Sequence, residues 1–256
     1  MVRGLYTAGV GMTAAMNKVD VIANNIANAA TTGYKKDNVI TQSFSEELMK
    51  RLHDPALNHV VHDVGIGGVR LGVFVDTIHT DFMNGSLNIT GNEFDLAVVG
   101  DGFFVVTAED RTGTQGEHYT RNGSFALLNG MLITKDGYAV MGSNGVINIP
   151  DGDFSVSETG AIYIDGEFID NIRMVSFNDN QSLRKYKDNL YTTTPESQIV
   201  EFAGSIQQGA LEMSNVNTVR EMVDLITTHR NYEASQRVIT TIDQQLGRAV
   251  SDIARR

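Results

Sequence analysis

Two narrow apolar stripes, one near each end of the chain, constrain its fold more than any other feature. The first stripe consists of Leu5, Ala8, Met12, Ala15, Val19, Ile22 and Ile26, and the second of Ile239, Ile242, Leu246, Ala249 and Ile253. Both stripes alternate between steps of three and four residues, which is the spacing of a coiled-coil seam. A stripe this narrow packs on one partner helix, so the pattern predicts an antiparallel coiled-coil pair of terminal helices. Periodicity alone leaves open two amphipathic helices that cap an ordinary domain.

Charge is distributed unevenly along the chain. The 256 residues are 41% hydrophobic, enough for a packed core in one large domain or two modest ones. Of the net charge of −11, residues 1–36 contribute +3 and residues 212–256 contribute zero, so residues 37–211 carry −14. No basic stripe is present that would neutralise phosphates, and nucleic acid is therefore not an expected partner. The acidic middle is expected on an outer, solvated surface.

Targeting signals are weak. The chain has no cysteine, which excludes disulfides and thiol chemistry. Threonines and glycines interrupt the apolar residues between Leu5 and Met16, which is unlike a secretory signal peptide. No run approaches the roughly 18 apolar residues of a transmembrane helix. We expect no transmembrane segment and, for a protein that leaves the cell, a route other than general secretion.

Helices are predicted at both ends and in the first connector. Residues 1–36 are expected to form an N-terminal helix, from about Leu5 to Asn28, followed by a signature segment in which Thr31-Thr32-Gly33 ends the helix. Residues 214–256 are expected to form the C-terminal helix, with Ser214 and Asn215 as natural N-cap residues.

The connector over residues 37–83 is mostly polar. Phe44, Leu48 and Leu52 predict one short amphipathic helix within it. Four glycines between residues 65 and 72 then predict an irregular or extended stretch.

Between residues 84 and 180 the pattern changes to that of strands. Turn dipeptides occur at Asn122-Gly123, Asn129-Gly130, Asp136-Gly137, Asn144-Gly145, Asp151-Gly152 and Asp165-Gly166. Such dipeptides supply the positive φ angles of tight hairpins, and their spacing leaves room for strands of about five residues. We predict an antiparallel all-β domain with strands that include Leu96–Val99, Phe103–Val106, Met131–Thr134, Tyr138–Met141 and Ile172–Phe177. With residues 181–213 as a return connector, the predicted fold class is α+β.

Motifs for catalysis or metal binding fail on their spacing. His59 and His62 could lie one turn apart in a helix, but a metal site needs three or four ligands. A calcium loop that begins at Asp151 would need Gly and Glu where Val156 and Ile162 stand. No nucleophile elbow or phosphate loop occurs. We predict no enzyme activity, no metal and no cofactor.

Three stretches resemble the rod and hook proteins of the bacterial flagellum. Residues 24–35 are similar to the N-terminal signature of rod proteins, except that Ala30 stands where family members often have Asn. Residues 85–105, with Tyr119–Phe125, and residues 209–217 provide the second and third stretches. The three occur in family order along nearly the whole chain.

The resemblance implies a structural subunit of the flagellar rod that polymerises into a helical tube and transmits torque. The terminal helices would line the export channel, and the β domain would lie outside. Implied partners are further copies of the chain, other rod or hook proteins and the flagellar type III export apparatus. Export in the unfolded state, without a cleaved signal peptide, would place the protein in the basal body outside the cytoplasmic membrane.

Two questions stay open at this point. The sequence does not separate a proximal from a distal rod subunit. The alternative from another class is a secreted or surface β-domain protein that binds carbohydrate or acts as a hydrolase, which would need a concave pocket with convergent polar groups.

The predicted assembly interface combines apolar residues of the helices with asparagines of the signature stretches. It consists of Leu5, Met12, Val19, Ile22, Asn24, Asn25, Ile26, Asn28, Asn215, Asn217, Met222, Ile226, Ile239, Ile242, Leu246 and Ile253. The asparagines near residue 28 have an alternative role, which is to satisfy backbone groups at a helix end. Because each stripe has one partner helix in the monomer, we expect the ends to become ordered chiefly on assembly.

Overall fold

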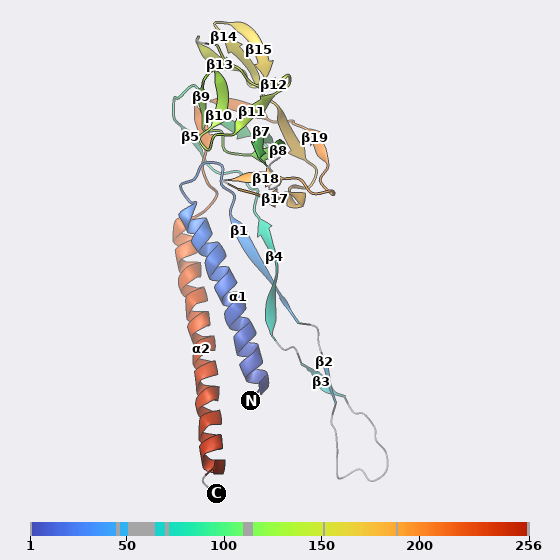
Figure 1. Cartoon of the computed structure of the whole chain (residues 1–256), viewed down its shortest axis with the longest axis vertical. Coiled ribbons are helices and arrows are strands. Elements are labelled where there is room, and N and C mark those ends of the chain that lie inside the picture. Colours follow the sequence, from blue (N-terminus) through green and yellow to red (C-terminus); the bar gives the residue numbers. More distant parts are fainter. Residues whose placement is uncertain are drawn as a thin grey trace. The chain divides into compact units, whose positions relative to one another are not determined.

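The computed structural model describes residues 2–44, 47–50, 65–69, 72–109, 115–150, 152–187 and 189–254 (Figure 1). The chain divides into two compact units, each assembled from segments that are distant in sequence. The first, which we call the helical unit, comprises Met1–Ile26, Asp37–His79 and Thr218–Arg256. The second, the β unit, comprises Ala27–Lys36 and Thr80–Asn217. Terminal helices and a central antiparallel β structure confirm the predicted α+β class.

Each end of the chain forms one long helix, as predicted. Helix α1 is Val2–Ala27 and helix α2 is Thr218–Ala254. The predicted N-cap of α2 is wrong by a few residues, because Asn215 uses its side chain elsewhere. Its Oδ1 accepts a hydrogen bond from Lys36 N at 2.9 Å, and its Nδ2 donates to Asp81 O at 2.8 Å.

The two helices lie side by side and run antiparallel within the helical unit (Figure 1). A methyl group on Gly4 would lie 3.4 Å from Ile242 Cδ1, and one on Gly11 would lie 3.8 Å from Ser235 Oγ. Two heptads further along α1, Asn25 Nδ2 donates a hydrogen bond to Glu221 Oε2 at 3.3 Å. From Gly4 to Gly11 and from Gly11 to Asn25, steps of seven and fourteen residues along α1 are matched by equal steps back along α2.

A β ribbon completes the helical unit. Strands β1 (Asp37–Ser43) and β4 (Val73–Thr80) form a two-stranded sheet, and β2 (Glu47–Lys50) pairs antiparallel with β3 (Gly65–Val69). Phe44, which follows β1, packs its ring 5.0 Å from that of Phe74 and 6.4 Å from that of Tyr6 on α1.

The short helix predicted around Leu48 is wrong. Residues Glu47–Lys50 form β2, whose backbone pairs with the glycine-rich strand β3, so the predicted extended stretch near residue 65 is confirmed. An isolated helix of about two turns is marginal even with charge pairs, and pairing with a second strand outweighs it. Leu52, the histidines at 59 and 62 and Asp151, which the sequence analysis considered, lie outside the described residues.

The β unit is built around one large antiparallel sheet. Its central strands follow the order β17-β18-β8-β7-β11-β10-β9, while β12 pairs with β11, β16 with β7 and β19 with β16. These strands are β7 (Phe103–Glu109), β8 (Gln115–Thr120), β9 (Phe125–Leu128), β10 (Met131–Thr134), β11 (Ala139–Gly142), β12 (Gly145–Val146), β16 (Met174–Phe177), β17 (Arg184–Lys185), β18 (Leu190–Thr192) and β19 (Ile199–Glu201).

Smaller sheets surround the large one. A three-stranded sheet has the order β13-β14-β15, made of β13 (Phe154–Val156), β14 (Ala161–Ile164) and β15 (Glu167–Asn171). Two pairs tie the return segment to the start of the unit, and they consist of β6 (Leu96–Val99) with β20 (Ser205–Gln208) and β5 (Leu87–Ile89) with β21 (Ala210–Glu212). A single 3-10 turn, η1, covers Asn180–Ser182.

Four of the six turn dipeptides form hairpins as predicted: Asn129-Gly130, Asp136-Gly137, Asn144-Gly145 and Asp165-Gly166. Asn129, Gly130, Gly137, Gly145 and Gly166 all have positive φ angles, and β6 and β10 match the predicted strands. Gly123 instead serves a close backbone approach, because a Cβ there would lie 1.6 Å from Leu96 O. Gly152 lies between β12 and β13, which do not pair with each other.

The core of the β unit has two sides, separated by β7. Phe104 and Val106 belong to a cluster that also contains Leu132 and Ile206, whereas Phe103 and neighbouring aromatics form a second cluster. Ile206 lies on β20, in the segment that the sequence analysis treated only as a return connector. The return segment is therefore part of the folded core.

Candidate functional site

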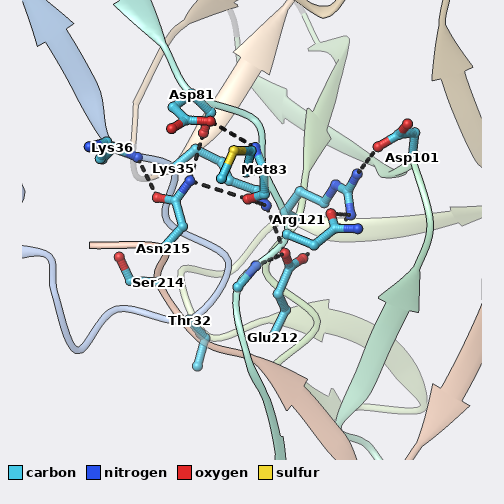
Figure 2. Close-up of polar contacts among 12 residues, drawn as sticks. Thr32, Lys35, Lys36, Asp81, Met83, Asp101, Arg121, Glu212, Ser214 and Asn215 are labelled. Atoms are coloured by element: carbon cyan, nitrogen blue, oxygen red, sulfur yellow. Dashed lines mark hydrogen bonds and ion pairs between the residues drawn. The ribbon is translucent and has the colours of Figure 1, made fainter. Parts of the chain in front are cut away.

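The most unusual site in the β unit is a buried group of three charged residues, which we call the Glu212 cluster: Lys35, Arg121 and Glu212 (Figure 2). Lys35 Nζ lies 2.7 Å from Glu212 Oε1, and Arg121 Nη1 lies 3.5 Å from Glu212 Oε2. The three side chains are 1%, 0% and 1% exposed, respectively. Charges are almost never buried this completely unless they are paired.

Two backbone groups and the side chain of Asn84 add hydrogen bonds to the cluster, while the buried Nε and Nη2 of Arg121 have no hydrogen-bond partner among the described residues. Gly85 N donates to Glu212 Oε1 at 2.9 Å, and Lys35 Nζ donates to Met83 O at 2.8 Å. Arg121 Nη1 also donates to Asn84 Oδ1, at 3.3 Å. The Glu212 carboxylate thus receives donors from three separate parts of the β unit.

The cluster holds two cations for one buried anion. Arg121 has a second, weaker ion pair with Asp101 at 3.8 Å, but the Asp101 side chain is 78% exposed. Burial lowers the pKa of Lys35, and the nearby Glu212 carboxylate opposes that shift. Burial also lowers the pKa of Arg121, again against the effect of Glu212. Glu212 is therefore the group that makes the buried positive charge tolerable.

The cluster also anchors the segment that follows α1. Gly33 N donates to the backbone carbonyl of Glu212 at 2.7 Å. Gly33 has a φ of +67°, and a Cβ there would lie 2.5 Å from the backbone of Arg121, so only glycine fits this approach. Thr32 Oγ1 donates to Asn122 Oδ1 at 2.6 Å.

The hairpin β17–β18 holds the same segment from another direction. Lys185 Nζ donates to Lys35 O at 2.6 Å and lies 4.3 Å from the centre of the Tyr34 ring. Asn189 Nδ2 donates to Thr32 O at 3.0 Å. The three stretches singled out in the sequence therefore meet in one place, where residues 32–36 contact Arg121–Asn122 and the return segment (Figure 2).

A second buried polar site lies in the helical unit. Asn25, which is 1% exposed, donates from Nδ2 to Asp37 O at 2.8 Å in addition to its contact with Glu221. Asp37 N donates back to Asn25 Oδ1 at 3.0 Å. Asn25 thus connects α1, α2 and the start of β1.

Three family models match successive parts of the chain. Residues 5–35 match "Flagella basal body rod protein", residues 97–164 match "Flagellar hook protein FlgE/F/G D1 domain", and residues 207–252 match "Flagellar basal body rod FlgEFG protein C-terminal". The flagellar basal-body rod protein FlgG of Bacillus subtilis (strain 168) is 33% identical, over 98% of this chain and 99% of that protein. The chain belongs to the flagellar basal-body rod protein family.

Other members of the family agree with this assignment. FlgG of Agrobacterium fabrum is 33% identical over 94% of this chain and 96% of its own length. The flagellar hook-basal body complex protein FlhO of Bacillus subtilis is 27% identical over the full length of both chains. As a rod family member, the chain is a structural subunit of the bacterial flagellum, and the carbohydrate-binding or hydrolase alternative is not favoured.

The structure distributes the predicted interface residues of this rod family member over several environments. The side chains of Ile22 and Asn25 are buried, and those of Met12, Val19, Ile26, Asn28, Asn215, Ile239 and Ile242 are partly buried. Exposed side chains are those of Leu5, Asn24, Asn217, Met222, Ile226 and Leu246. Ile253 lies in α2, but its side chain is outside the described part.

Sequence reasoning missed part of an exposed apolar strip on α2. The strip consists of Val219, Met222, Val223 and Ile226, each at least half exposed. Its spacing of three, four and seven residues could have revealed it. Lys35, Arg121 and Glu212 are the charged residues of three otherwise uncharged stretches, 24–35, 119–125 and 209–217. Isolated charges of this kind are a sequence signal for buried ion pairs.

Neither a metal centre nor a membrane helix emerges from the described residues. They contain no group of three His, Cys, Asp or Glu side chains that could hold a metal ion. No helix among them is both long and apolar enough to cross a bilayer.

Proposed function

We propose that α1 and α2 form an antiparallel coiled coil whose outer surface joins copies of this chain into the rod. Support comes from the heptad register of the contacts at Gly4, Gly11 and Asn25. The more buried positions of α2 continue this register, at alternating steps of four and three: Glu221, Leu225, Thr228, Tyr232, Ser235, Ile239 and Ile242. Alternating steps of four and three are the spacing of a coiled-coil seam, which supports the proposal.

Asn25 and Glu221 would set the alignment of the two helices. Both are buried, and a shift of the seam would separate them and break the hydrogen bond between them. A single buried polar residue in a seam is a well-attested way to fix register, at some cost in stability.

The observation that carries the assembly proposal is the apolar strip Val219, Met222, Val223 and Ile226, which faces away from the seam. Burying side chains of this size is worth about 1.5 to 3 kcal/mol each. Because this strip is exposed in the monomer, its burial against a neighbouring subunit would contribute to the free energy of association. Repeated head-to-tail contacts of this kind do not close and grow a helical tube.

The wider biological setting follows from family membership. We assign the chain further copies of itself and other rod or hook proteins as neighbours, and the flagellar type III apparatus as its export route. Its location would be the basal body, outside the cytoplasmic membrane, without a cleaved signal peptide. We propose no catalytic role, because the relatives are named as rod proteins.

Electron microscopy of the purified full chain at high concentration tests the assembly proposal. The wild type should form filaments or tubes, and the double variant Met222→Asp/Ile226→Asp should stay monomeric. The control Gln236→Asp/Gln244→Asp adds the same charge at two exposed polar positions of α2 and should still assemble. Tubes of normal length from the first variant would remove the strip from the subunit contact.

A further inference from the structure

We propose that Glu212 is the closing latch of the β unit. In this role its carboxylate pairs with two buried cations, Lys35 from the N-terminal segment and Arg121 from the β8–β9 connection, and it does so only when the C-terminal return segment docks. The contacts of Glu212 with Lys35 and Arg121 are then the last part of the β unit to form. Folding of the unit therefore depends on segments near both ends of the chain.

The latch joins residues that are very far apart in sequence. Lys35 and Glu212 are 177 positions apart, and Arg121 and Glu212 are 91 apart. Hairpins such as β9–β10 pair residues that are close in sequence, for example Leu128 with Met131, and such hairpins can form early. Closing a long loop costs more conformational entropy than closing a short one. Contacts across long loops are therefore expected to form after local contacts.

The whole return segment docks together with Glu212. Ile206 enters the core, and its N donates to Glu158 O at 2.9 Å. Gly209 N donates to Asp95 O at 2.8 Å, and Met213 N donates to Ser86 O at 2.9 Å. Docking of this segment therefore adds strand β20 to β6 and strand β21 to β5.

Without the return segment, the two buried cations would lack their buried anion. Among the described residues, Lys35 and Arg121 would then have only Asp81, which is partly exposed, and the exposed Asp101 as nearby carboxylates. Two cations in that position repel one another, and the segment that contains Gly33 would also lack the Glu212 carbonyl as a backbone partner. The N-terminal segment should consequently dock only when the return segment does.

One biological consequence rests on the proposed export route. A chain that passes through a narrow channel in extended form must not fold early. Because the latch needs residues 33–35 and 205–215 together, the β unit cannot close until almost the whole chain is available, whichever end leads.

The test measures folding and unfolding rates of the purified full chain by stopped-flow circular dichroism, which requires neither export nor assembly. Glu212→Gln should raise the unfolding rate at least about a hundredfold, because it leaves buried cations without an anion. The folding rate should change less than about threefold, since a contact made after the transition state affects unfolding alone. Equal effects on both rates, or a slower folding rate alone, would overturn the proposal.

The matched control is Glu117→Gln. Glu117 also pairs with an arginine of the β unit, Arg173, at 2.6 Å, but the two side chains are 44% and 39% exposed. Neither rate should change more than about threefold in this control. If Glu117→Gln raised the unfolding rate as much as Glu212→Gln does, the effect would belong to any Arg–Glu pair and not to the buried cluster.

A triple variant keeps the test decisive if Glu212→Gln does not fold. Lys35→Met/Arg121→Met/Glu212→Gln removes all three charges and leaves no buried charge unpaired. It should fold and recover most of the melting temperature that Glu212→Gln loses. A triple variant that is as unstable as Glu212→Gln would show that neutralising Lys35 and Arg121 is not what Glu212 does.

Discussion

At the scale of single residues, burial changes the acid–base behaviour of side chains in the β unit. Burial raises the pKa of Tyr119 above its ordinary value of 10.0, and the Glu117 carboxylate adds to that shift. Lys35 shows the opposite case, since burial lowers its pKa below the ordinary 10.5. Between the folded and unfolded pKa values, a raised tyrosine pKa makes stability fall as pH increases, and a lowered lysine pKa makes it rise.

Tyr119→Phe should therefore reduce the loss of stability that the wild type shows above about pH 10. In that range the unfolded state releases the tyrosine proton while the folded state still holds it, and phenylalanine has no such proton. Urea unfolding at pH 8 and at pH 11 measures the difference. An equal fall in unfolding free energy for both proteins would contradict the assignment of the pH effect to Tyr119.

Gly123→Ala should destabilise the β unit by at least about 3 kcal/mol, because its Cβ would lie 1.6 Å from the carbonyl oxygen of Leu96 and the backbone would have to move. Gly9→Ala is the matched control, since nothing lies within 4 Å of a Cβ at that position in α1. The control should be neutral or stabilising by up to about 1 kcal/mol. Thermal unfolding followed by circular dichroism distinguishes the two, and a neutral Gly123→Ala would show that the β6 backbone yields.

At the scale of elements, local patterns were predictable and partner-dependent ones were not. The heptad stripes and the turn dipeptides lie within a few residues of one another, so the sequence indicates α1, α2 and the hairpins directly. Strands such as β20 (Ser205–Gln208) and β17 (Arg184–Lys185) have no apolar alternation and exist because of the strands they pair with. The Glu212 cluster could not be predicted for the same reason. Residues 35, 121 and 212 are far apart in sequence, and no periodic pattern indicates that they lie together in the fold.

Changing Ile242 and Leu246 together to Asp should prevent assembly while the β unit stays folded. Ile242 is partly buried in the proposed seam, and Leu246, which is exposed in the monomer, lies one turn further. Burying an aliphatic side chain of this size in a subunit contact is worth about 1.5 to 3 kcal/mol, and burying a carboxylate there adds a further penalty. Circular dichroism should retain its strand signal, and electron microscopy should show no tubes. Normal tubes from this variant would mean that the C-terminal stripe takes no part in assembly.

At the scale of the whole molecule, two discontinuous units predict two levels of protection from hydrogen exchange. Backbone amides of residues 2–26 and 218–254 should exchange quickly in the monomer and slowly in the polymer, because most of the α2 surface is exposed in the single chain. Amides of β7 should be protected in both states, since its side chains are buried on both faces. Strong protection of both helices in dilute monomer would contradict ordering on assembly.

The position of the Glu212 cluster also has a mechanical meaning. The chain enters the β unit at residue 27 and leaves it at residue 217, and Lys35–Glu212 and Lys36–Asn215 bridge the two strands near these points. A pulling force applied to the ends of the β unit would reach these two contacts before it reaches any strand pair of the large sheet. The chain between these contacts, residues 37–211, would then be bypassed by the force and would carry little tension. This part of the chain can accept an insertion, for example at the Asp165-Gly166 turn, without weakening the path along which force travels.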